Sequence, residues 1–569
     1  NSEQHLREAV ELARELGERG RIAYTLSDFG LTLEREGHER EALAAYEEVV
    51  RLVETLTASL SKDVSAEVFS TKRGNRELYE RLIHLLIKHG RVADALGYLE
   101  RAKAKSLVEA LAGAEVSAND PALKELIRRV RNASDAVRAV ESALTTETAR
   151  PQALRDLLKI KAAQAQFTRA QADYTAAVAA LQHVNPAYAS LVAVRSTDLT
   201  QLRQALAPGT LLVEYFPTDT TLYIFYLSRA EAPQVRAVAI KHEELAQLVN
   251  EYRAAVVVPS KSAAFARSRG LSAEMGTGSE VKQAIRSMQE ITGKLYDVLF
   301  APVQTEIDRA DTLLVVPAAE LYYLPFHALG RAQTDGSISY LIEQKRFAYL
   351  AAADAINTVA AGNANARSQA SNRQGLLALG NPDGSLPAAA EEVKTLSRIF
   401  PQANIYTGAD ATLARVESKP AQPIPYIHFA THGIINSREP KESYLLLAGT
   451  PGRLSVKDLV EDTYGMSFNG TRLVTLSACQ TSIGGWDPSA VYSSLSRAFA
   501  KAGAPTVVAS LWSVNDAATR DMMTVFYKEL AAGQSKAEAM RRAQLAVMHD
   551  ARFTHPFFWA PFIVLGDWR

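Results

Sequence analysis

The sequence predicts a helical N-terminal region followed by a larger α/β region. Residues 104–187 are rich in Ala, Leu, Arg, Lys and Gln, which is the composition of long helices. After Pro208, short apolar runs alternate with amphipathic segments, and this alternation is typical of an α/β fold. The runs at 426–430 and 472–476 are rich in large and β-branched residues, and they predict buried strands.

The composition argues against several classes of protein. The 569 residues include 63 basic and 63 acidic side chains, and a net charge of zero gives no general attraction to nucleic acid or to anionic lipid. No run of 18 or more apolar residues is free of charges, so we expect no membrane span. Cys479 is the only cysteine, which argues against a secreted disulfide scaffold and favours the cytoplasm. The chain begins with Asn1 rather than Met, and we expect its start to be truncated.

A pattern that occurs twice in the first hundred residues predicts helical repeats. It places a glycine five residues before an alanine and a large side chain four residues further on, at Gly37, Ala42 and Tyr46 and again at Gly90, Ala95 and Leu99. Gly30, seven residues before Gly37, belongs to the same pattern. This is the spacing of tetratricopeptide helix pairs, in which small residues let two helices cross closely. A generic array of helical hairpins is the alternative.

Strand and helix signals then follow one another along the α/β region. Strands are predicted at 210–215, 221–227, 313–317, 376–379, 404–406, 426–430, 472–476 and 506–511, and helices at 281–306, 388–400, 491–502, 518–532 and 536–549. Segments 257–280 and 358–374 are rich in small and polar residues, and we expect mobile loops there that gate the site or are cleaved by the protein itself.

Two reactive side chains follow neighbouring predicted strands. His432 comes directly after the run at 426–430, and Cys479 comes shortly after the run at 472–476. The carboxyl ends of strands are where open α/β sheets build their sites, so we expect the two side chains to meet. They are 47 residues apart, and a lone Cys with a His about 50 residues upstream is the order of caspase-like proteases. Because imidazole can accept a thiol proton at neutral pH, a cysteine peptidase is the first hypothesis.

Neighbouring residues add detail and leave alternatives open. The N–H groups of Gly433 and Cys479 are candidates for holding the oxyanion of a tetrahedral intermediate. His428 shares a strand face with His432 and is a rival for the base, although a hydrogen-bonded place in the core is the expected role. Taken alone, Cys479 is more often an inert packing residue, and it is the pairing with His432 that favours catalysis.

Other chemistries lack their signals in the sequence. One cysteine excludes cysteine-cluster zinc sites, and neither a phosphate-binding G-x4-G-K-[ST] motif nor a G-x-S-x-G elbow occurs. We therefore expect no cofactor and no metal.

The α/β region resembles the CHAT peptidases, a caspase-like family usually fused to tetratricopeptide repeats. The matching segments are Val316–Pro317, Leu324–Leu329, His428–Gly433, Leu476–Thr481, Arg497–Phe499, Ala502–Ala504, Ala509–Asp516 and Trp559–Phe562. The resemblance implies an endopeptidase with His432 as general base and Cys479 as nucleophile. The Gly-Glu-Gly that often follows the nucleophile is replaced by Asp487-Pro488-Ser489-Ala490, so the pocket shape differs there.

The resemblance also implies a substrate pocket and partners. Asp516 is similar in place to an acidic residue that lines the primary specificity pocket of separase, which predicts cleavage after Arg or Lys. Trp512 and Asp487 are further pocket candidates, and the alternative for Asp516 is that it caps a helix starting at Ala517. The implied partners are a protein substrate and a regulatory protein or ribonucleoprotein bound by the repeats, in bacterial defence or signalling. No membrane contact and no direct nucleic-acid binding are expected.

The complete prediction is a helical repeat region followed by a caspase-like α/β sandwich peptidase domain. We expect tetratricopeptide-like repeats over 1–103, a long helical connector over 104–195, an α/β subdomain over 196–374 and the catalytic subdomain over 375–569. The alternative function is a catalytically silent adaptor that uses repeats and a degenerate protease fold for protein assembly. A different Cys hydrolase, such as an amidase, is a third hypothesis.

Overall fold

The chain divides into two compact units, Asn1–Leu199 and Thr200–Arg569. The computed structural model describes residues 2–16, 19–59, 72–111, 121–148, 154–184, 198–257, 279–334, 337–356, 375–417, 424–434, 439–460, 470–477, 502–512 and 515–569, and single positions between these ranges. The predicted order of a helical region and an α/β region is confirmed. The finer domain boundaries at residues 103 and 374 stay predictions, and the predicted loops at 257–280 and 358–374 lie almost entirely outside the described residues.

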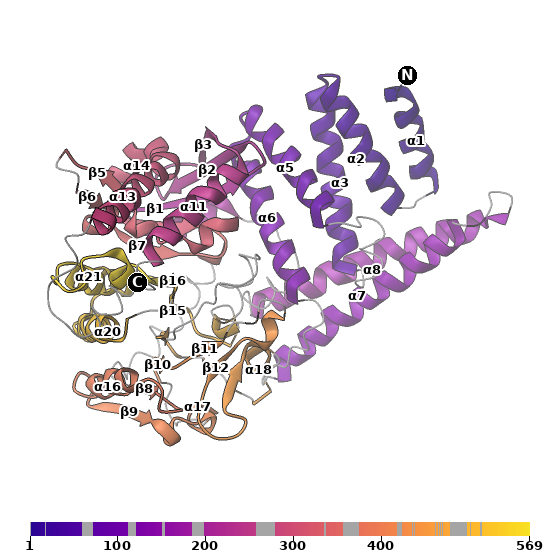
Figure 1. The fold of residues 1–569 in the computed structure, drawn as a ribbon. Coiled ribbons are helices and arrows are strands. Elements are labelled where there is room, and N and C mark those ends of the chain that lie inside the picture. The colour runs from indigo at the N-terminus through magenta and orange to yellow at the C-terminus, as the bar shows by residue number, and fades with distance from the viewer. Residues whose placement is uncertain are drawn as a thin grey trace. The chain divides into compact units, whose positions relative to one another are not determined.

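The N-terminal unit is built from helices alone within its described residues (Figure 1). They are α1 (Ser2–Leu16), α2 (Arg19–Arg35), α3 (Glu39–Ser59), α5 (Lys72–Lys88), α6 (Val92–Leu111), α7 (Pro121–Thr148) and α8 (Leu157–Val184). Helices α2 and α3 form one hairpin and α5 and α6 another, each with a connection of three residues. The two predicted repeat patterns fall on these two hairpins.

The glycine at the centre of each hairpin ends its first helix in the same way. Gly37 and Gly90 have positive φ angles of 85° and 74°, which glycine adopts without steric cost. The N–H of the residue after each glycine reaches back five residues, from His38 to Leu33 O at 2.8 Å and from Arg91 to Leu86 O at 2.8 Å. This is the Schellman arrangement, which satisfies the last carbonyls of a helix. The repeated spacing in the sequence therefore reflects a repeated turn.

The close helix crossing predicted for the first repeat occurs at Gly30. A methyl group added there would lie 2.7 Å from Cε1 of Tyr46, so the ring of Tyr46 packs directly against the backbone of α2. Tyr46 and Ala42 are both fully buried, and in the second hairpin Ala95 and Leu99 are buried in the same way. The second copy of the pattern thus repeats the packing as well as the turn.

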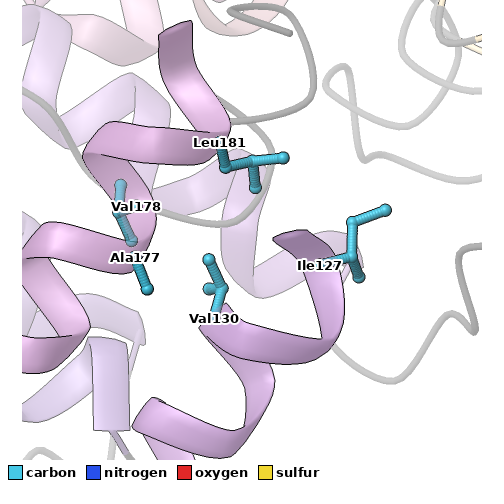
Figure 2. Packing of buried hydrophobic residues seen from close by; sticks show 5 residues of the cluster. All are labelled: Ile127, Val130, Ala177, Val178 and Leu181. Atoms are coloured by element: carbon cyan, nitrogen blue, oxygen red, sulfur yellow. The ribbon is translucent and has the colours of Figure 1, made fainter. Parts of the chain in front are cut away.

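Helices α7 and α8 lie side by side as a long hairpin (Figure 1). One apolar cluster joins Ile127 and Val130 of α7 to Ala177, Val178 and Leu181 of α8, and Figure 2 shows these side chains on the two neighbouring helices. A second cluster, further along the pair, consists of Val137, Phe167 and Ala170. The prediction of long helices in this part of the chain is confirmed.

A single mixed sheet forms the centre of the C-terminal unit. Within the described residues it has eleven strands, in the order β3-β2-β1-β4-β7-β16-β15-β14-β10-β8-β9. The strands are β1 (Thr210–Pro217), β2 (Thr221–Ser228), β3 (Gln234–Ala239), β4 (Thr312–Val316), β7 (Arg346–Tyr349), β8 (Gly375–Gly380), β9 (Gln402–Thr407), β10 (Tyr426–Ala430), β14 (Leu473–Leu476), β15 (Thr506–Ser510) and β16 (Phe562–Gly566). Most of the sequence-predicted strands are found within a residue or two of their expected bounds.

Helices and two smaller sheets accompany this central sheet. The helices are α10 (Leu199–Ala205), α11 (His242–Val257), α13 (Ser279–Leu299), α14 (Gln304–Arg309), α16 (Pro387–Leu396), α17 (Leu413–Glu417), α18 (Val456–Val460), α20 (Asp516–Ala531), α21 (Lys536–Met548) and α22 (Pro556–Trp559). A three-stranded sheet joins β11 (Gly433–Ile434), β12 (Tyr444–Leu446) and β13 (Arg453–Ser455), and a two-stranded sheet joins β5 (Gly330–Ala332) and β6 (Ile338–Tyr340).

Two predicted helices are longer than the observed ones. The helix expected at 281–306 ends at Leu299 because Pro302 follows, and a proline lacks the N–H that a continuing helix needs. The helix expected at 388–400 ends at Leu396 and leaves Phe400 buried under the sheet. Most of the helix expected at 491–502 lies outside the described residues.

The parallel strands bring several strand ends to one edge of the sheet. Strands β8, β10, β14 and β15 are parallel neighbours, with Gly380 opposite Ala430, Phe429 opposite Leu476 and Leu476 opposite Ala509. Their carboxyl ends therefore share an edge, as the sequence predicted. None of the helices in the described part of the chain is both long and apolar enough to cross a membrane.

Replacing Gly30 by Val tests the packing of the first repeat. The larger side chain must displace the buried ring of Tyr46, and overpacking of this kind lowers the free energy of unfolding by about 1–3 kcal/mol. Gly97→Ala is the matched control, because Gly97 lies within α6 with open space around it and alanine favours a helix by about 1 kcal/mol. Urea unfolding followed by helical circular dichroism should show opposite shifts. Equal shifts in the same direction would contradict the predicted contact.

Candidate active site

The backbone around His432 is held by the small sheet that follows β10. The hydroxyl of Thr431 donates to Leu446 O at 2.8 Å, and the N–H of Leu446 donates to His432 O at 2.9 Å. Gly433 then stands opposite Leu445 in the antiparallel pair of β11 and β12. His432 is thus fixed two residues beyond the carboxyl end of β10, between the central sheet and the small one.

The imidazole of His432 contacts the loop that leaves β8. Its Nε2 lies 2.7 Å from Oγ of Ser385 and 3.9 Å from Oδ2 of Asp383. The side chain is 28% exposed, so solvent and a substrate can reach it. Hydrogen bonds from the hydroxyl and the N–H of Ser385, together with the nearby imidazole, lower the pKa of Asp383. The carboxylate is therefore ionised at neutral pH.

The nucleophile candidate follows the strand next to β10. Strand β14 is hydrogen-bonded to β10 in parallel register and ends at Leu476. Cys479 and the pocket candidate Asp487 lie outside the described residues. The predicted roles of both residues stay predictions, as does the oxyanion role of the Cys479 N–H.

The remaining pocket candidates follow β15, the next parallel strand. Asn515 caps α20, because its side chain accepts hydrogen bonds from the N–H groups of Ala517 and Ala518. The alternative in which Asp516 is the cap is therefore wrong, and Asp516 is instead the exposed first residue of the helix. Trp512 is 3% exposed, and its indole N–H donates to Phe557 O at 3.1 Å. Trp512 is therefore a buried residue of the core, and its predicted place in a substrate pocket stays a prediction.

His428 belongs to a buried polar cluster rather than to the exposed edge. Its Nδ1 lies 3.1 Å from the hydroxyl of Tyr527, which donates to Oγ1 of Thr475 at 2.8 Å. Its Nε2 lies 2.8 Å from a carboxylate oxygen of Glu392. All four side chains are buried, so the cluster links α16 and α20 to strands β10 and β14. The expected core role of His428 agrees with this position.

Ser385 and Asp383 were not expected at the site. They lie in the turn Asn381-Pro382-Asp383-Gly384-Ser385, whose residue types are those of an ordinary loop. The sequence places both residues directly after the predicted strand at 376–379. In the structure this strand is β8, a parallel neighbour of β10, so its carboxyl end lies beside that of β10.

The described residues offer little to a metal. One group of three, Glu3, Glu36 and His38, brings potential ligand atoms together, and it lies in the N-terminal unit. The group is largely exposed, and Glu3 is already paired with Arg7 at 2.8 Å. The edge that carries His432 has no such group among its described side chains.

His327 lies within one of the segments that carry the family resemblance, and its ring is buried and hydrogen-bonded in the core. Its Nδ1 lies 3.1 Å from the hydroxyl of Tyr349 on β7, and its Nε2 lies 3.0 Å from the side-chain amide of Gln544 on α21. That amide also donates to Phe562 O on β16. Burial lowers the pKa of His327 to about 3, so the ring is neutral. It stabilises the junction of β7 and β16 rather than a reaction.

Comparison with protein families settles the nature of the C-terminal part. Residues 289–567 match the family model of the CHAT domain. This part of the chain is a CHAT domain. The predicted fold class, helical repeats followed by a caspase-like α/β domain, is confirmed by this match together with the observed order of elements.

Among curated proteins, the chain is similar to tetratricopeptide repeat protein 28. The human protein is 27% identical over 326 residues, which cover 48% of this chain and 13% of the relative. The mouse protein is 26% identical with the same coverage. The chain therefore spans a small part of the length of these relatives.

Solved structures show weaker likenesses. The Saccharomyces cerevisiae separase–securin complex gives a TM-score of 0.44 at 10% identity, covering 99% of this chain and 53% of that chain. The Arg-specific cysteine proteinase gingipain R gives 0.31 at 11% identity, covering 54% and 73%. TM-scores below 0.5 do not establish a common fold.

The neutral state of His327 predicts a loss of stability in acid. The folded-state pKa lies below the ordinary 6.5, so the unfolded chain binds the proton first and folding weakens as pH falls below about 6.5. Between pH 7 and pH 5 this residue should account for about 2 kcal/mol of the free energy of unfolding. His327→Gln should flatten that pH slope while also lowering stability at pH 7. An unchanged slope in urea unfolding would contradict the assignment.

Proposed function

We propose that the CHAT domain is a cysteine endopeptidase in which His432 accepts the proton of the Cys479 thiol. The observation that carries the proposal is the accessible imidazole of His432 at the carboxyl end of β10. A thiol becomes a strong nucleophile when it loses its proton to such a base. The attack of the thiolate on a peptide carbonyl then gives an acyl-enzyme and a free amine, and water releases the acyl group.

The strand pairing supports the proximity of the two residues. Phe429 and Leu476 are paired across β10 and β14, and His432 and Cys479 each come three residues later in the sequence. Three residues of extended chain span about 10 Å at most. The proposed reaction therefore requires that both segments run along the shared edge of the sheet, so that the His432 and Cys479 side chains meet.

The N–H of Gly433 is a suitable oxyanion donor. Leu446 donates to His432 O while Gly433 stands opposite Leu445, so Gly433 occupies a non-hydrogen-bonded position of the antiparallel ladder. Its N–H consequently points away from β12. With the N–H of Cys479 it would hold the negative oxygen of the tetrahedral intermediate.

The charge at the edge supports a basic substrate residue. Asp516 is exposed at the first position of α20, beyond the end of β15, and the cap of this helix is the preceding residue, Asn515. A carboxylate at this place would pair with Arg or Lys on the amino side of the scissile bond. Asp487 stays a second candidate for the same pocket.

The helical unit is proposed to bind a protein partner that controls the peptidase. Repeated helical hairpins present an extended surface, and tetratricopeptide repeats occur in the curated relatives by name. The proposal includes a cytoplasmic place, since Cys479 needs a reducing environment to stay a thiol, and a role in bacterial defence or signalling.

A cleavage assay on a peptide library tests the Cys–His pair. Cys479→Ala and His432→Ala should each lower cleavage by about 10⁴-fold or more, because the two residues act as one unit. His549→Ala, an exposed histidine after α21, is the control and should leave the rate unchanged. Cleavage that survives Cys479→Ala would contradict the mechanism. Silence of every variant, with each candidate partner present, would favour the adaptor.

The same peptide library tests whether Asp516 determines the preference for Arg or Lys before the scissile bond. Asp516→Asn should reduce cleavage after Arg or Lys by about 10- to 100-fold, the value of one charge-assisted hydrogen bond, and spare any slower cleavage after neutral residues. Asp521→Asn, five residues along α20 and paired with Arg520, is the matched control. If Asp516→Asn and Asp521→Asn had the same cleavage preference, the assignment of Asp516 to the pocket would be wrong.

A further inference from the structure

The loop between β8 and α16 is locked to the end of β10. The N–H of Asn381, the residue after β8, donates at 3.0 Å to the carbonyl oxygen of Ala430, the last residue of β10. Asn381 then turns the chain with a φ of 50°, and its side chain accepts the N–H of Leu386 at 2.7 Å. The residues between these two points, which include Asp383 and Ser385, are thereby held in register with His432.

Within the loop, the direction of the hydrogen bonds is fixed by proton count. The hydroxyl of Ser385 donates to Oδ1 of Asp383 at 2.7 Å, and the Ser385 N–H donates to the same oxygen at 3.1 Å. A hydroxyl has one proton, and an ionised carboxylate can only accept. The Ser385 oxygen must therefore accept its 2.7 Å hydrogen bond from Nε2–H of His432.

We propose that Asp383 and Ser385 are positioning residues that hold His432 with its proton on Nε2 and leave Nδ1 as the base for the Cys479 thiol. This inference rests on the proposed function. An imidazole that donates from one nitrogen presents a lone pair on the other. When Nδ1 takes the thiol proton, the ring becomes positive, and the carboxylate 3.9 Å from Nε2 stabilises that charge. Asp383 is the charged group that faces the ring among the described residues.

The arrangement differs from a serine nucleophile with its histidine base. In a Ser-His-Asp triad the serine donates to the histidine, and the carboxylate binds the other ring nitrogen. Here the hydroxyl of Ser385 donates to the carboxylate and its oxygen accepts from Nε2–H of His432, so no histidine lone pair faces the hydroxyl and both groups act from the Nε2 side. The contact therefore orients the ring and does not create a second nucleophile.

Alkylation of the thiol by iodoacetamide tests the inference on the full chain without a substrate. Cys479 is the only cysteine, so intact mass reports its modification alone. Ser385→Ala and Asp383→Asn should slow alkylation at pH 7 by up to about 30-fold, because a thiol with the ordinary pKa of about 8.5 is only about 3% ionised at that pH. At pH 10, where an ordinary thiol ionises unaided, both variants should match the wild type. A general loss of folding would lower or raise the rate at both pH values.

Controls separate this inference from the proposed function. Ser385→Thr keeps the hydroxyl and should restore most of the rate at pH 7, and Ser397→Ala, an exposed serine at the other end of α16, should change nothing. If His432→Ala slows alkylation at pH 7 while Ser385→Ala and Asp383→Asn do not, the positioning role is wrong and the Cys–His pair stands. If His432→Ala also leaves the rate unchanged, the pair itself is wrong and the positioning role falls with it.

Discussion

The parallel hydrogen bonding of β8, β10, β14 and β15 is the constraint on which the candidate site depends. Parallel strands share a direction, so the residues after their last hydrogen-bonded pair arrive at one edge of the sheet. His432 follows β10, Ser385 follows β8 and Asp516 follows β15. The parallel register of these strands brings residues that are up to 131 positions apart in sequence to the same edge of the sheet.

Buried polar contacts beneath the edge hold the helices that carry the loops. The cluster of His428, Glu392, Tyr527 and Thr475 joins α16 and α20 to the strands, and it lies in a region without solvent. A shift of α20 would break the hydrogen bonds of Tyr527 to His428 and Thr475, at about 1–3 kcal/mol for each buried group left unsatisfied, and Glu392 places α16 at 2.8 Å from the same His428. Helix α16 begins just after Ser385 and α20 begins at Asp516. Their seating therefore sets the positions of the loop and of the pocket candidate.

The sequence predicted most of the fold because its signals were local. The repeated spacing at Gly37 and Gly90 falls on two equal hairpins, although these glycines form the turns instead of the expected close helix crossing. The apolar run ending before His432 is a strand with all five residues buried. Strand β16 was missed because a short apolar run beside Trp559 does not differ from ordinary core packing. It nevertheless lies in the middle of the sheet, antiparallel to β15 and parallel to β7. Ser385 was missed for a related reason, since its partner His432 is brought near only by tertiary pairing.

Covalent labelling by an irreversible peptidyl inhibitor with Arg at its reactive end would show whether His432 activates Cys479. If the two residues form a catalytic pair, peptide mapping finds the label on Cys479 in the folded wild-type chain. Labelling is then lost in His432→Ala and in urea-unfolded protein, since both lack the assembled base. Labelling of Cys479 at equal rates in the wild type, His432→Ala and the unfolded chain would contradict this pairing, because it would show an ordinary accessible thiol with no base beside it.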